Sequence, residues 1–326
     1  MTLTQLRYLV AIADSGLNIT QAAERVHATQ PGLSKQLKQL EDELGFQLFI
    51  RKGRSLDSIA PAGGQVIEHA RRVLAETANI RSYAANERGE HSGRLLLATT
   101  HTQARYVLPS VIAAIKRDFP RVNVDLLAAG DSEVLAALDQ ADLALISTAG
   151  TVPQGGVAVP LFRWRRVLLV QDTHPLAGIQ GAPSLAELAQ HPLISYESST
   201  HADSSLQRTF ASAGVSPQIA MTARDANLIK TYVRAGLGAG LLAEMAIGQR
   251  EDADLRILPA PVELPECITW AVIPRGRVLR DYALALLHGL APQLDPRDLR
   301  RVLEGNQDAN WPQPPQWMEL RQPISV

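Results

Sequence analysis

Residues 18–40 read NITQAAERVHATQPGLSKQLKQL, and this stretch has the pattern of two short helices joined by a turn. Asn18 can cap the first helix, whose small inward-facing alanines let a second helix cross closely. Thr29 can cap the second helix, and Pro31 is tolerated in its first turn. The second helix has one apolar face, with leucines at helical spacing at Leu33, Leu37, Leu40 and Leu44. The stretch therefore predicts a helix-turn-helix.

The opposite face of the second helix carries small, hydroxyl and basic residues. It comprises Pro31, Ser34, Lys35 and Lys38, and no acid interrupts it before Asp42. Such a face can enter a DNA major groove with the N-terminal turns of the helix leading. The lysines suit phosphates or guanine edges, and the polar residues near the N-terminus suit phosphates or base edges. The predicted DNA-binding face therefore also includes Thr29 and Gln30.

A basic run, Arg51-Lys52-Gly53-Arg54, follows the apolar residues 48–50. It has the pattern of a wing that reaches phosphates or a minor groove, so Arg51 and Arg54 join the predicted DNA-binding residues. The alternative interpretation is an ordinary solvated basic turn beside a leucine-striped helix. Helix-turn-helix shapes also occur in purely structural bundles, so the pattern alone leaves both interpretations open.

The composition limits where nucleic acid could bind. The 326 residues are too many for one ordinary core, and the formal net charge of -1 confines any basic surface to a local patch. The single cysteine, Cys267, excludes an intramolecular disulfide and a cysteine-rich zinc site. No signal-peptide pattern and no membrane-length apolar span appear. We therefore expect a cytoplasmic protein with no metal site and no membrane partner.

Residues 61–89 have the pattern of one uninterrupted helix that begins at Pro61, a favourable first-turn residue. Val66, Val73 and Ile80 recur every seven residues along it. A helix–helix contact between two copies of the chain is our preferred interpretation of this stripe. Packing of the helix on its own domain is the alternative.

From about residue 93 to residue 292, apolar runs typical of strands alternate with helical patterns. The expected strands are residues 94–98, 123–127, 143–146, 166–171, 193–196, 218–222, 238–242 and 268–273. This alternation predicts parallel sheets covered by helices, arranged as one sheet or as two half-size lobes. Ligands in such folds bind at the carboxyl ends of strands. Residues past about 293 have little apolar periodicity and many prolines.

The end of the first expected strand carries a polar, uncharged sequence. Residues 99–103 read TTHTQ, and a helix is expected to begin there. Free backbone N–H groups at a helix N-terminus, beside three hydroxyls and an amide, suit a small anion such as sulfate or a carboxylate. The alternative is that Thr99 or Thr100 only caps the helix. The residues alone favour neither interpretation.

Residues 28–51, ATQPGLSKQLKQLEDELGFQLFIR, and residues 61–63, PAG, resemble the helix-turn-helix signature of LysR-type transcriptional regulators. The resemblance implies an α-rich winged helix-turn-helix domain over residues 1–60 and a dimerisation helix over 61–91. It implies a two-lobed α/β effector domain, similar to type 2 periplasmic-binding proteins, over 92–292, followed by a tail over 293–326. The partners it implies are promoter DNA, RNA polymerase and further copies of the chain, in dimers or tetramers.

The effector half resembles the CysB-like branch of that family, through residues 98–106, ATTHTQARY, and residues 225–238, DANLIKTYVRAGLG. That resemblance implies control of sulfur assimilation, cysteine biosynthesis or sulfonate-use genes. It implies no cofactor, only a small anionic effector, with sulfate, thiosulfate, O-acetylserine and N-acetylserine as the candidates. It assigns effector binding to Thr100, Thr102 and Gln103.

Three further positions follow from the same resemblance. Ser147 stands where the branch usually has threonine, and it keeps the hydroxyl. Trp164 matches the tryptophan at the crossover between lobes, where its alternative role is hinge packing. Residues 200–204 read THADS where the branch usually reads FTGRS, so His201 replaces a threonine and Asp203 an arginine. Either the ligand has changed, with His201 as a pH-sensitive donor, or the loop varies and Asp203 faces solvent.

Two other function classes compete with a regulator. An enzyme built on the two-lobed domain lacks support, because the sequence holds no paired acids, metal cluster or nucleophile–base set. A free-standing solute-binding protein would not need the basic face of the second helix. We therefore expect no catalytic residues, and a different small organic acid is the alternative effector.

Overall fold

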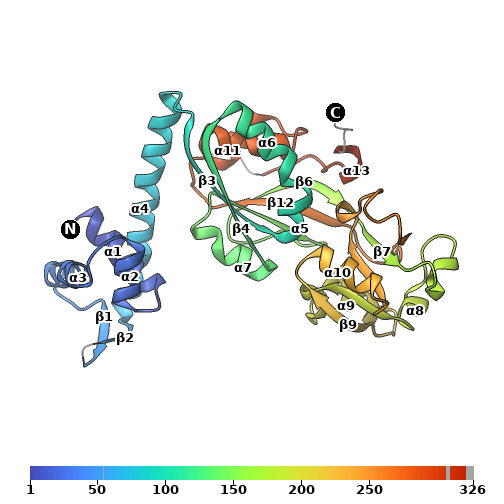
Figure 1. Ribbon diagram of the computed structural model, residues 1–326. Helices are drawn as coiled ribbons and strands as arrows, with labels where there is room; N and C mark the ends of the chain where they lie inside the picture. Colours follow the sequence, from blue (N-terminus) through green and yellow to red (C-terminus); the bar gives the residue numbers. More distant parts are fainter. Residues whose placement is uncertain (54, 306–308, 321–326) are drawn as a thin grey trace. The chain divides into compact units, whose positions relative to one another are not determined.

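The computed structural model describes residues 1–53, 55–305 and 309–320 (Figure 1). The chain divides into two compact units, Met1–Arg88 and Gly89–Val326. None of the helices in these described ranges is both long enough and apolar enough to cross a membrane.

The first unit is built around one apolar core. Helices α1 (Leu3–Asp14), α2 (Ile19–Arg25) and α3 (Gln30–Leu44) precede a β-hairpin, β1 (Phe49–Lys52) and β2 (Ser55–Ile59), and the long helix α4 (Pro61–Glu87). Each of these elements contributes to the core, through residues such as Leu9, Ala22, Leu37, Phe49, Leu56 and Ile67. The predicted winged helix-turn-helix is therefore confirmed.

Helices α2 and α3 begin at the predicted caps. Asn18 Oδ1 accepts a hydrogen bond from the Gln21 N–H at 3.0 Å, and Thr29 Oγ1 accepts one from the Gly32 N–H at 3.3 Å. These bonds satisfy N–H groups that have no partner within the helix. Of the predicted apolar face, Leu33, Leu37 and Leu40 are buried, whereas Leu44 is half-buried.

Helix α4 uses its first half to cover the core of the first unit. Ile67 and Ala70 are buried in that core, and Val66 packs against it. Farther along the helix, Val73 and Ile80 are 43% and 65% exposed. The apolar stripe therefore divides between the two interpretations: its first part packs on its own domain, and its second part is open to a partner.

The second unit contains two five-stranded sheets, which we call lobe I and lobe II (Figure 1). The sheet of lobe I has the order β4-β3-β5-β12-β6, formed by Arg121–Ala129, Ser92–Thr100, Leu143–Thr148, Cys267–Ile273 and Val157–Trp164. Its helices are α5 (His101–Tyr106), α6 (Leu108–Asp118), α7 (Asp131–Ala136) and α11 (Asp281–Leu290). Apolar cores cover both faces of this sheet.

The sheet of lobe II has the order β11-β7-β10-β8-β9, formed by Arg256–Pro259, Arg166–Val170, Ala239–Ala243, Pro192–Tyr196 and Gln218–Ala223. Its helices are α8 (Leu185–Leu188), α9 (Ser205–Ser212) and α10 (Ala226–Arg234). The chain crosses from lobe I to lobe II between β6 and β7, and it returns between β11 and β12. The two-lobed α/β domain is therefore confirmed.

The prediction of parallel sheets was wrong, because both sheets are mixed. β12 runs antiparallel to β5 and β6, and β7 runs antiparallel to β10 and β11. The expected strands also omitted β6 and β11. Pro160 lies inside β6, and proline, which has no N–H, is tolerated in a strand only at an edge or a bulge. β6 is an edge strand, and its register with β12 shifts beside Trp270.

Residues past 293, which the sequence separates as a tail, continue the fold of lobe I. Helix α12 (Pro296–Leu303) buries Leu299 and Leu303 in the core of that lobe. Before the short helix α13 (Trp317–Leu320), the chain lies along β6, where the Arg163 N–H donates to the Pro315 carbonyl at 2.8 Å. This segment therefore covers an otherwise open sheet edge.

Candidate nucleic-acid interface and effector site

The predicted DNA-reading face lies on α3 and is accessible. Thr29, Gln30, Pro31, Lys35 and Lys38 are exposed, and Ser34 is half-buried. The Gln30 side-chain amide donates to Ser34 Oγ at 3.1 Å, which orders these two polar groups relative to each other. Neither lysine forms an ion pair with a described residue. Their ammonium groups are therefore available to an anionic partner.

The predicted wing is the β1–β2 hairpin. The Arg51 guanidinium lies 3.7 Å from Glu41 Oε2, and Glu41 Oε1 accepts the Leu48 N–H at 2.8 Å. Glu41 is only 7% exposed, so this acid holds the base of the wing and does not face solvent. Arg54, also predicted to bind DNA, lies outside the described residues.

The predicted effector residues Gln103, Ser147 and Trp164 meet in one hydrogen-bonded cluster, which also contains Thr269. Gln103 Nε2 donates to Ser147 Oγ at 3.0 Å and to Thr269 Oγ1 at 3.2 Å. Trp164 Nε1 lies 3.3 Å and 3.1 Å from the same two hydroxyl oxygens. The two hydroxyls are 2.9 Å apart. We call these four residues the Gln103 cluster.

Counting donors shows what the Gln103 cluster can offer a ligand. The Ser147 and Thr269 oxygens both accept from Gln103 and Trp164, and one hydroxyl donates to the other. The second hydroxyl proton has no acceptor among the described residues. The buried Gln103 Oε1 has no donor there either. The cluster therefore retains one donor and one acceptor for an incoming group.

Thr100 and Thr102 lie at the start of α5, directly before Gln103. Thr100 Oγ1 caps α5 by accepting the Gln103 N–H at 3.5 Å, and Thr102 Oγ1 donates across the lobes to the Tyr196 hydroxyl at 3.3 Å. Tyr196 also accepts the Ala243 N–H at 3.3 Å. Burial raises the pKa of Tyr196, so its hydroxyl keeps a proton that it can donate.

Other polar contacts join the two lobes near this cluster. The Tyr106 hydroxyl of lobe I and the Asn227 side-chain amide of lobe II lie 2.6 Å apart. Burial raises the pKa of Tyr106 to about 12, which keeps this hydroxyl protonated. Arg224 of lobe II contacts Glu133 of lobe I at 3.2 Å. Direct side-chain contacts therefore join lobe I to lobe II at this boundary.

His201 lies in lobe II, at the end of the 3-10 turn Glu197–Thr200. Within the described residues, no hydrogen bond joins its side chain to the Gln103 cluster, and it lies near Asp131, the first residue of α7 in lobe I. Burial raises the pKa of Asp131, whereas a hydrogen bond from Ser198 and the proximity of His201 lower it. Asp203 is exposed, as the interpretation of a variable loop expects.

Sequence reasoning missed Thr269, Tyr196 and Asp131. Thr269 is fully buried in β12, and a lone hydroxyl residue within the apolar strand CITWAVI was the available signal. Asp131 follows β4 as Thr100 ends β3, and these two strands are paired in register. The position of Asp131 at the end of an expected strand was therefore the signal for that residue.

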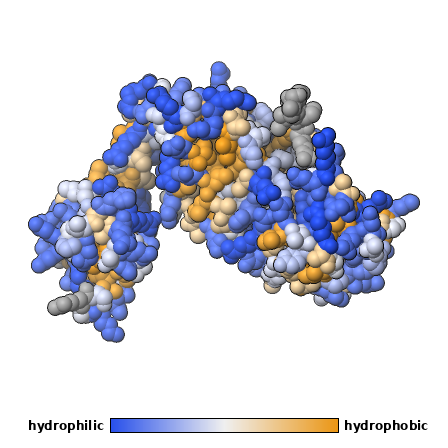
Figure 2. All heavy atoms as spheres, viewed as in Figure 1, coloured by the Kyte–Doolittle hydropathy of each residue, from blue (hydrophilic) through white to orange (hydrophobic). Residues whose placement is uncertain are grey.

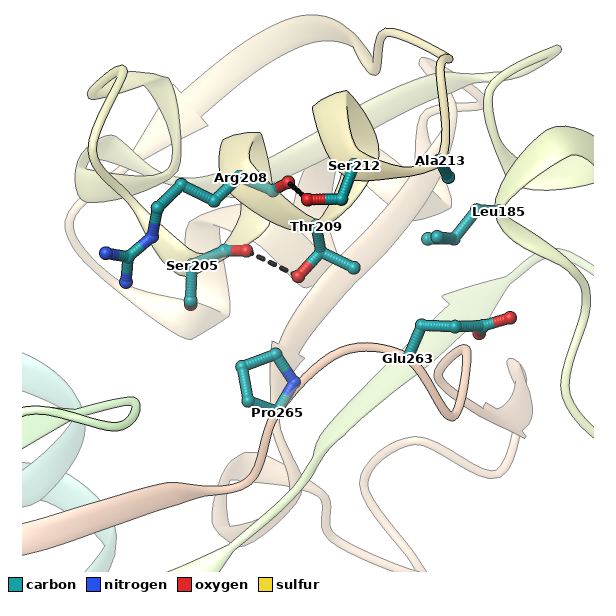
Figure 3. A pocket seen from close by; sticks show the side chains of 8 residues that line it. All are labelled: Leu185, Ser205, Arg208, Thr209, Ser212, Ala213, Glu263 and Pro265. Atoms are coloured by element: carbon teal, nitrogen blue, oxygen red, sulfur yellow. Dashed lines mark hydrogen bonds between the residues drawn. The ribbon is translucent and has the colours of Figure 1, made fainter.

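A separate pocket of about 370 Å³ lies in lobe II, beside α9. Figure 3 shows Arg208 and Glu263 on opposite sides of it, with Thr209 between them donating to the Ser205 carbonyl at 2.7 Å. None of the predicted effector residues lines this pocket. Across the described ranges, no group of three His, Cys, Asp or Glu residues could hold a metal ion.

Residues 3–63 match the family described as "Bacterial regulatory helix-turn-helix protein, lysR family". Residues 88–295 match the "LysR substrate binding domain". Together with the fold and the α3 face, these matches identify the class of protein. The chain belongs to the LysR family of transcriptional regulators.

Two relatives and one solved structure show which members of this family the chain is similar to. The HTH-type transcriptional regulator CysB of Haemophilus influenzae is 38% identical over 296 residues, which cover 90% of this chain and 91% of that protein. The CysB of Burkholderia cenocepacia is 34% identical over 312 residues, with coverages of 95% and 99%. The solved cofactor-binding domain of the Cbl transcriptional regulator has 35% identity and a TM-score of 0.60, and covers 66% of this chain and 95% of that chain. These relatives are regulators and not enzymes.

Proposed function

We propose that this regulator binds promoter DNA through α3 and the wing, and that a small anionic effector binds between lobes I and II. The accessible basic face of α3 is the observation that carries the DNA-binding part. We further propose that its targets are genes of sulfur assimilation, cysteine biosynthesis or sulfonate use. The likeness to CysB and Cbl regulators along most of the chain supports this assignment.

The proposed mechanism links effector binding to placement of the DNA-binding units. Copies of the chain assemble as dimers or tetramers in the cytoplasm and place two α3 helices in successive major grooves. An effector that binds one lobe arrangement better than another shifts the population toward it. That shift changes DNA bending and contact with RNA polymerase.

The DNA-binding part is tested by replacing Lys35 and Lys38 together with Ala. Binding to a duplex selected by the chain from random DNA should weaken, and the slope of log affinity against log salt should fall by about 1 for each phosphate that the variant no longer neutralises. The matched control replaces the exposed cations Arg72 and Arg81 of α4 with Ala and should leave the slope unchanged. An unchanged slope in the lysine variant removes the α3 face from the interface.

The effector part rests on the polar, uncharged groups that meet at the lobe boundary. Tyr196 and one hydroxyl of the Gln103 cluster each have a proton to donate, and neutral donors of this kind bind anions in buried sites. Sulfate, thiosulfate, O-acetylserine and N-acetylserine remain the candidate effectors. A thermal-shift screen identifies one of them if the melting temperature rises with its concentration.

Replacing Thr100 and Thr102 together with Val should abolish the response to the effector and leave DNA binding intact. Thr209→Val is the matched control, because Thr209 lines the separate pocket beside α9. If the control loses the response and the double variant keeps it, the effector binds in that pocket and not at the lobe boundary.

A further inference from the structure

The two connections between the lobes lie beside the last part of the described chain. The first connection is Arg165, which joins β6 to β7, and the second ends at Glu266, directly before β12. Residues 309–320, which we call the strap, pass along β6 and end in α13 beside it (Figure 1). The match to the LysR substrate binding domain ends at residue 295, so the strap lies beyond that match.

Glu266 is the residue at which the two connections and the strap meet. Its carboxylate binds two arginines at the first connection, with Arg165 Nε 2.8 Å from Oε1 and Arg163 Nη1 3.3 Å from Oε2. Gln316 of the strap donates to Glu266 Oε1 at 3.0 Å. The hydrogen bond from Arg165 and then that from Gln316 lower the pKa of Glu266. The strap therefore takes part in the contact that ties one connection to the other.

Further contacts hold the strap on the end of β6 that leads into lobe II. The Arg163 N–H donates to the Pro315 carbonyl at 2.8 Å, and Arg163 Nε donates to the Pro314 carbonyl at 2.8 Å. The rings of Trp317 and Phe162 pack together with their centroids 4.9 Å apart. Charge-assisted hydrogen bonds and aromatic pairs of this kind are stabilising. The strap is therefore bound to the hinge by backbone, charge and ring contacts together.

Trp164 links the same strand to the candidate effector site. Successive side chains of an extended segment point to opposite faces. The arginines on either side of Trp164 bind Glu266, whereas Trp164 Nε1 lies 3.3 Å from Ser147 Oγ and 3.1 Å from Thr269 Oγ1. Thr269 follows Glu266 along β12. A displacement of either connection at the strap would therefore also move a residue of the Gln103 cluster.

We propose that the strap is a clamp on the hinge, in which Gln316 and Trp317 hold the two connections so that lobes I and II keep one arrangement. Without these contacts the hinge opens locally more often, and the lobes sample a wider range of arrangements. An effector acts only by favouring one arrangement over another, so the clamp sets the population from which that shift begins. The clamp acts in the chain without effector, whichever ligand binds between the lobes.

The test compares two double variants of the strap. The clamp variant, Gln316→Ala with Trp317→Ala, removes the side chains that contact the hinge. The control variant, Gln313→Ala with Met318→Ala, shortens two exposed side chains of the same segment and includes the same glutamine replacement. Both are made in the full chain, and DNA binding is measured on each, so that every preparation is known to be active.

Hydrogen–deuterium exchange reports the opening of the hinge. It is followed by mass spectrometry in peptides that cover residues 162–167 and 263–268. We expect exchange there to be about tenfold faster or more in the clamp variant, because it loses a hydrogen bond to a charged group and an aromatic contact. The control variant should exchange at the rate of the unmodified chain.

The distance between the lobes decides whether this opening changes their arrangement. Spin labels are attached to cysteines introduced at Ser110 of lobe I and Ala211 of lobe II, which are both exposed. Cys267 is 3% exposed and is protected from the label. Labelled chain is diluted into excess unlabelled chain, so that distances within one copy are measured. The distance distribution should broaden in the clamp variant and stay unchanged in the control variant.

An unchanged distance distribution in the clamp variant would overturn the inference. Faster exchange with unchanged distances would mean that the strap only stabilises β6 locally, and equal changes in both variants would mean that the contacts of Gln316 and Trp317 are not special. If the clamp variant does not fold, Gln316→Ala alone is compared with Gln313→Ala by the same measurements. None of these results affects the proposed function, which the salt-slope and effector-response measurements decide separately.

Discussion

At the scale of single residues, a buried ion pair stabilises the part of lobe II that contacts lobe I. Lys230 Nζ and Asp252 Oδ2 lie 2.6 Å apart, and their side chains are 3% and 1% exposed. Arg234 adds a contact to Asp252 at 3.1 Å. The Lys230 ammonium also lies 5.6 Å from the centre of the Tyr106 ring of lobe I, close enough for a cation–π interaction. The pair therefore supports α10 and the lobe boundary together.

Asp252→Ala should destabilise the second unit by about 3–5 kcal/mol, because it leaves the Lys230 charge buried without its partner. Urea unfolding measures the loss. The control is Asp254→Ala, which removes an exposed acid that also contacts Arg234 and should have a much smaller effect. Equal effects of the two variants would show that the burial of the pair does not matter.

The same pair predicts the direction of a pH effect. Burial alone would raise the pKa of Asp252, but the hydrogen bond from Lys230 brings it below its ordinary value. Its contribution to stability is therefore present above the ordinary pKa of an aspartate and is lost as the pH falls through the lower folded pKa. Unfolding curves between pH 5 and pH 2 should show a steeper loss for the unmodified chain than for Asp252→Asn.

From the residues alone, sequence reasoning reached only the part of the candidate effector site that is local. Thr100, Thr102 and Gln103 follow one another at the end of an expected strand, so their proximity needs no tertiary information. Thr269 is 166 residues from Gln103, and only the antiparallel register of β12 with β5 places it opposite Ser147. Hydrophobic alternation indicates that a strand exists but not which strand it pairs with or in which direction.

At the scale of secondary-structure elements, a close backbone contact joins α4 to the base of the wing. A Cβ added at Gly63 would lie 2.0 Å from the Leu48 carbonyl oxygen, whereas a Cβ at the adjacent Gly64 would meet nothing within 4 Å. Leu48 also donates its N–H to Glu41, which forms the ion pair with Arg51. The contact between Gly63 and Leu48 therefore lies next to the residues that hold the wing. Gly63 therefore sets how closely the long helix approaches the wing.

Gly63→Ala should destabilise the first unit by about 1–3 kcal/mol or more, because the clash is with backbone that must move. Gly64→Ala should instead stabilise it by about 0.5–1 kcal/mol, since glycine is unfavourable inside a helix. Thermal unfolding of the two variants checks the opposite signs. Stabilisation by both substitutions would mean that α4 and the wing can separate without cost.

Element predictions succeeded where capping chemistry is explicit and failed where a strand lies at an edge. Asn18 and Thr29 cap α2 and α3 as expected, because a cap is decided by neighbours in sequence. β6 was missed because it contains Pro160, and proline argues against a strand. The exception is a strand at the edge of a sheet, where the missing N–H needs no partner, and β6 is such a strand. Edge position is a property of the whole sheet and is invisible in a local window.

At the scale of the molecule, two apolar surfaces are available for self-association. Figure 2 shows a hydrophobic area on the second unit over β4, where Leu126 and Leu127 are 42% and 44% exposed. β4 is hydrogen-bonded only to β3, so its outer edge is unpaired among the strands of the described ranges. The second surface is the exposed part of the α4 stripe, Val73 and Ile80. Unpaired edges and apolar patches of this kind are typical of interfaces.

If both surfaces hold copies of the chain together, introducing charged residues at either surface should break one kind of contact. The assembly should then have a lower mass, because it contains fewer copies. Leu126→Lys with Leu127→Lys would place two charges in one contact, and Val73→Lys with Ile80→Lys would do so in the other. Combining all four substitutions should give a monomer, because a lysine buried in an apolar contact loses its hydration without gaining a partner. Light scattering after size exclusion measures the mass. Val262→Lys, at an isolated apolar residue that is 83% exposed, should change nothing. A quadruple variant with the mass of the unmodified chain would place the interface on other surfaces.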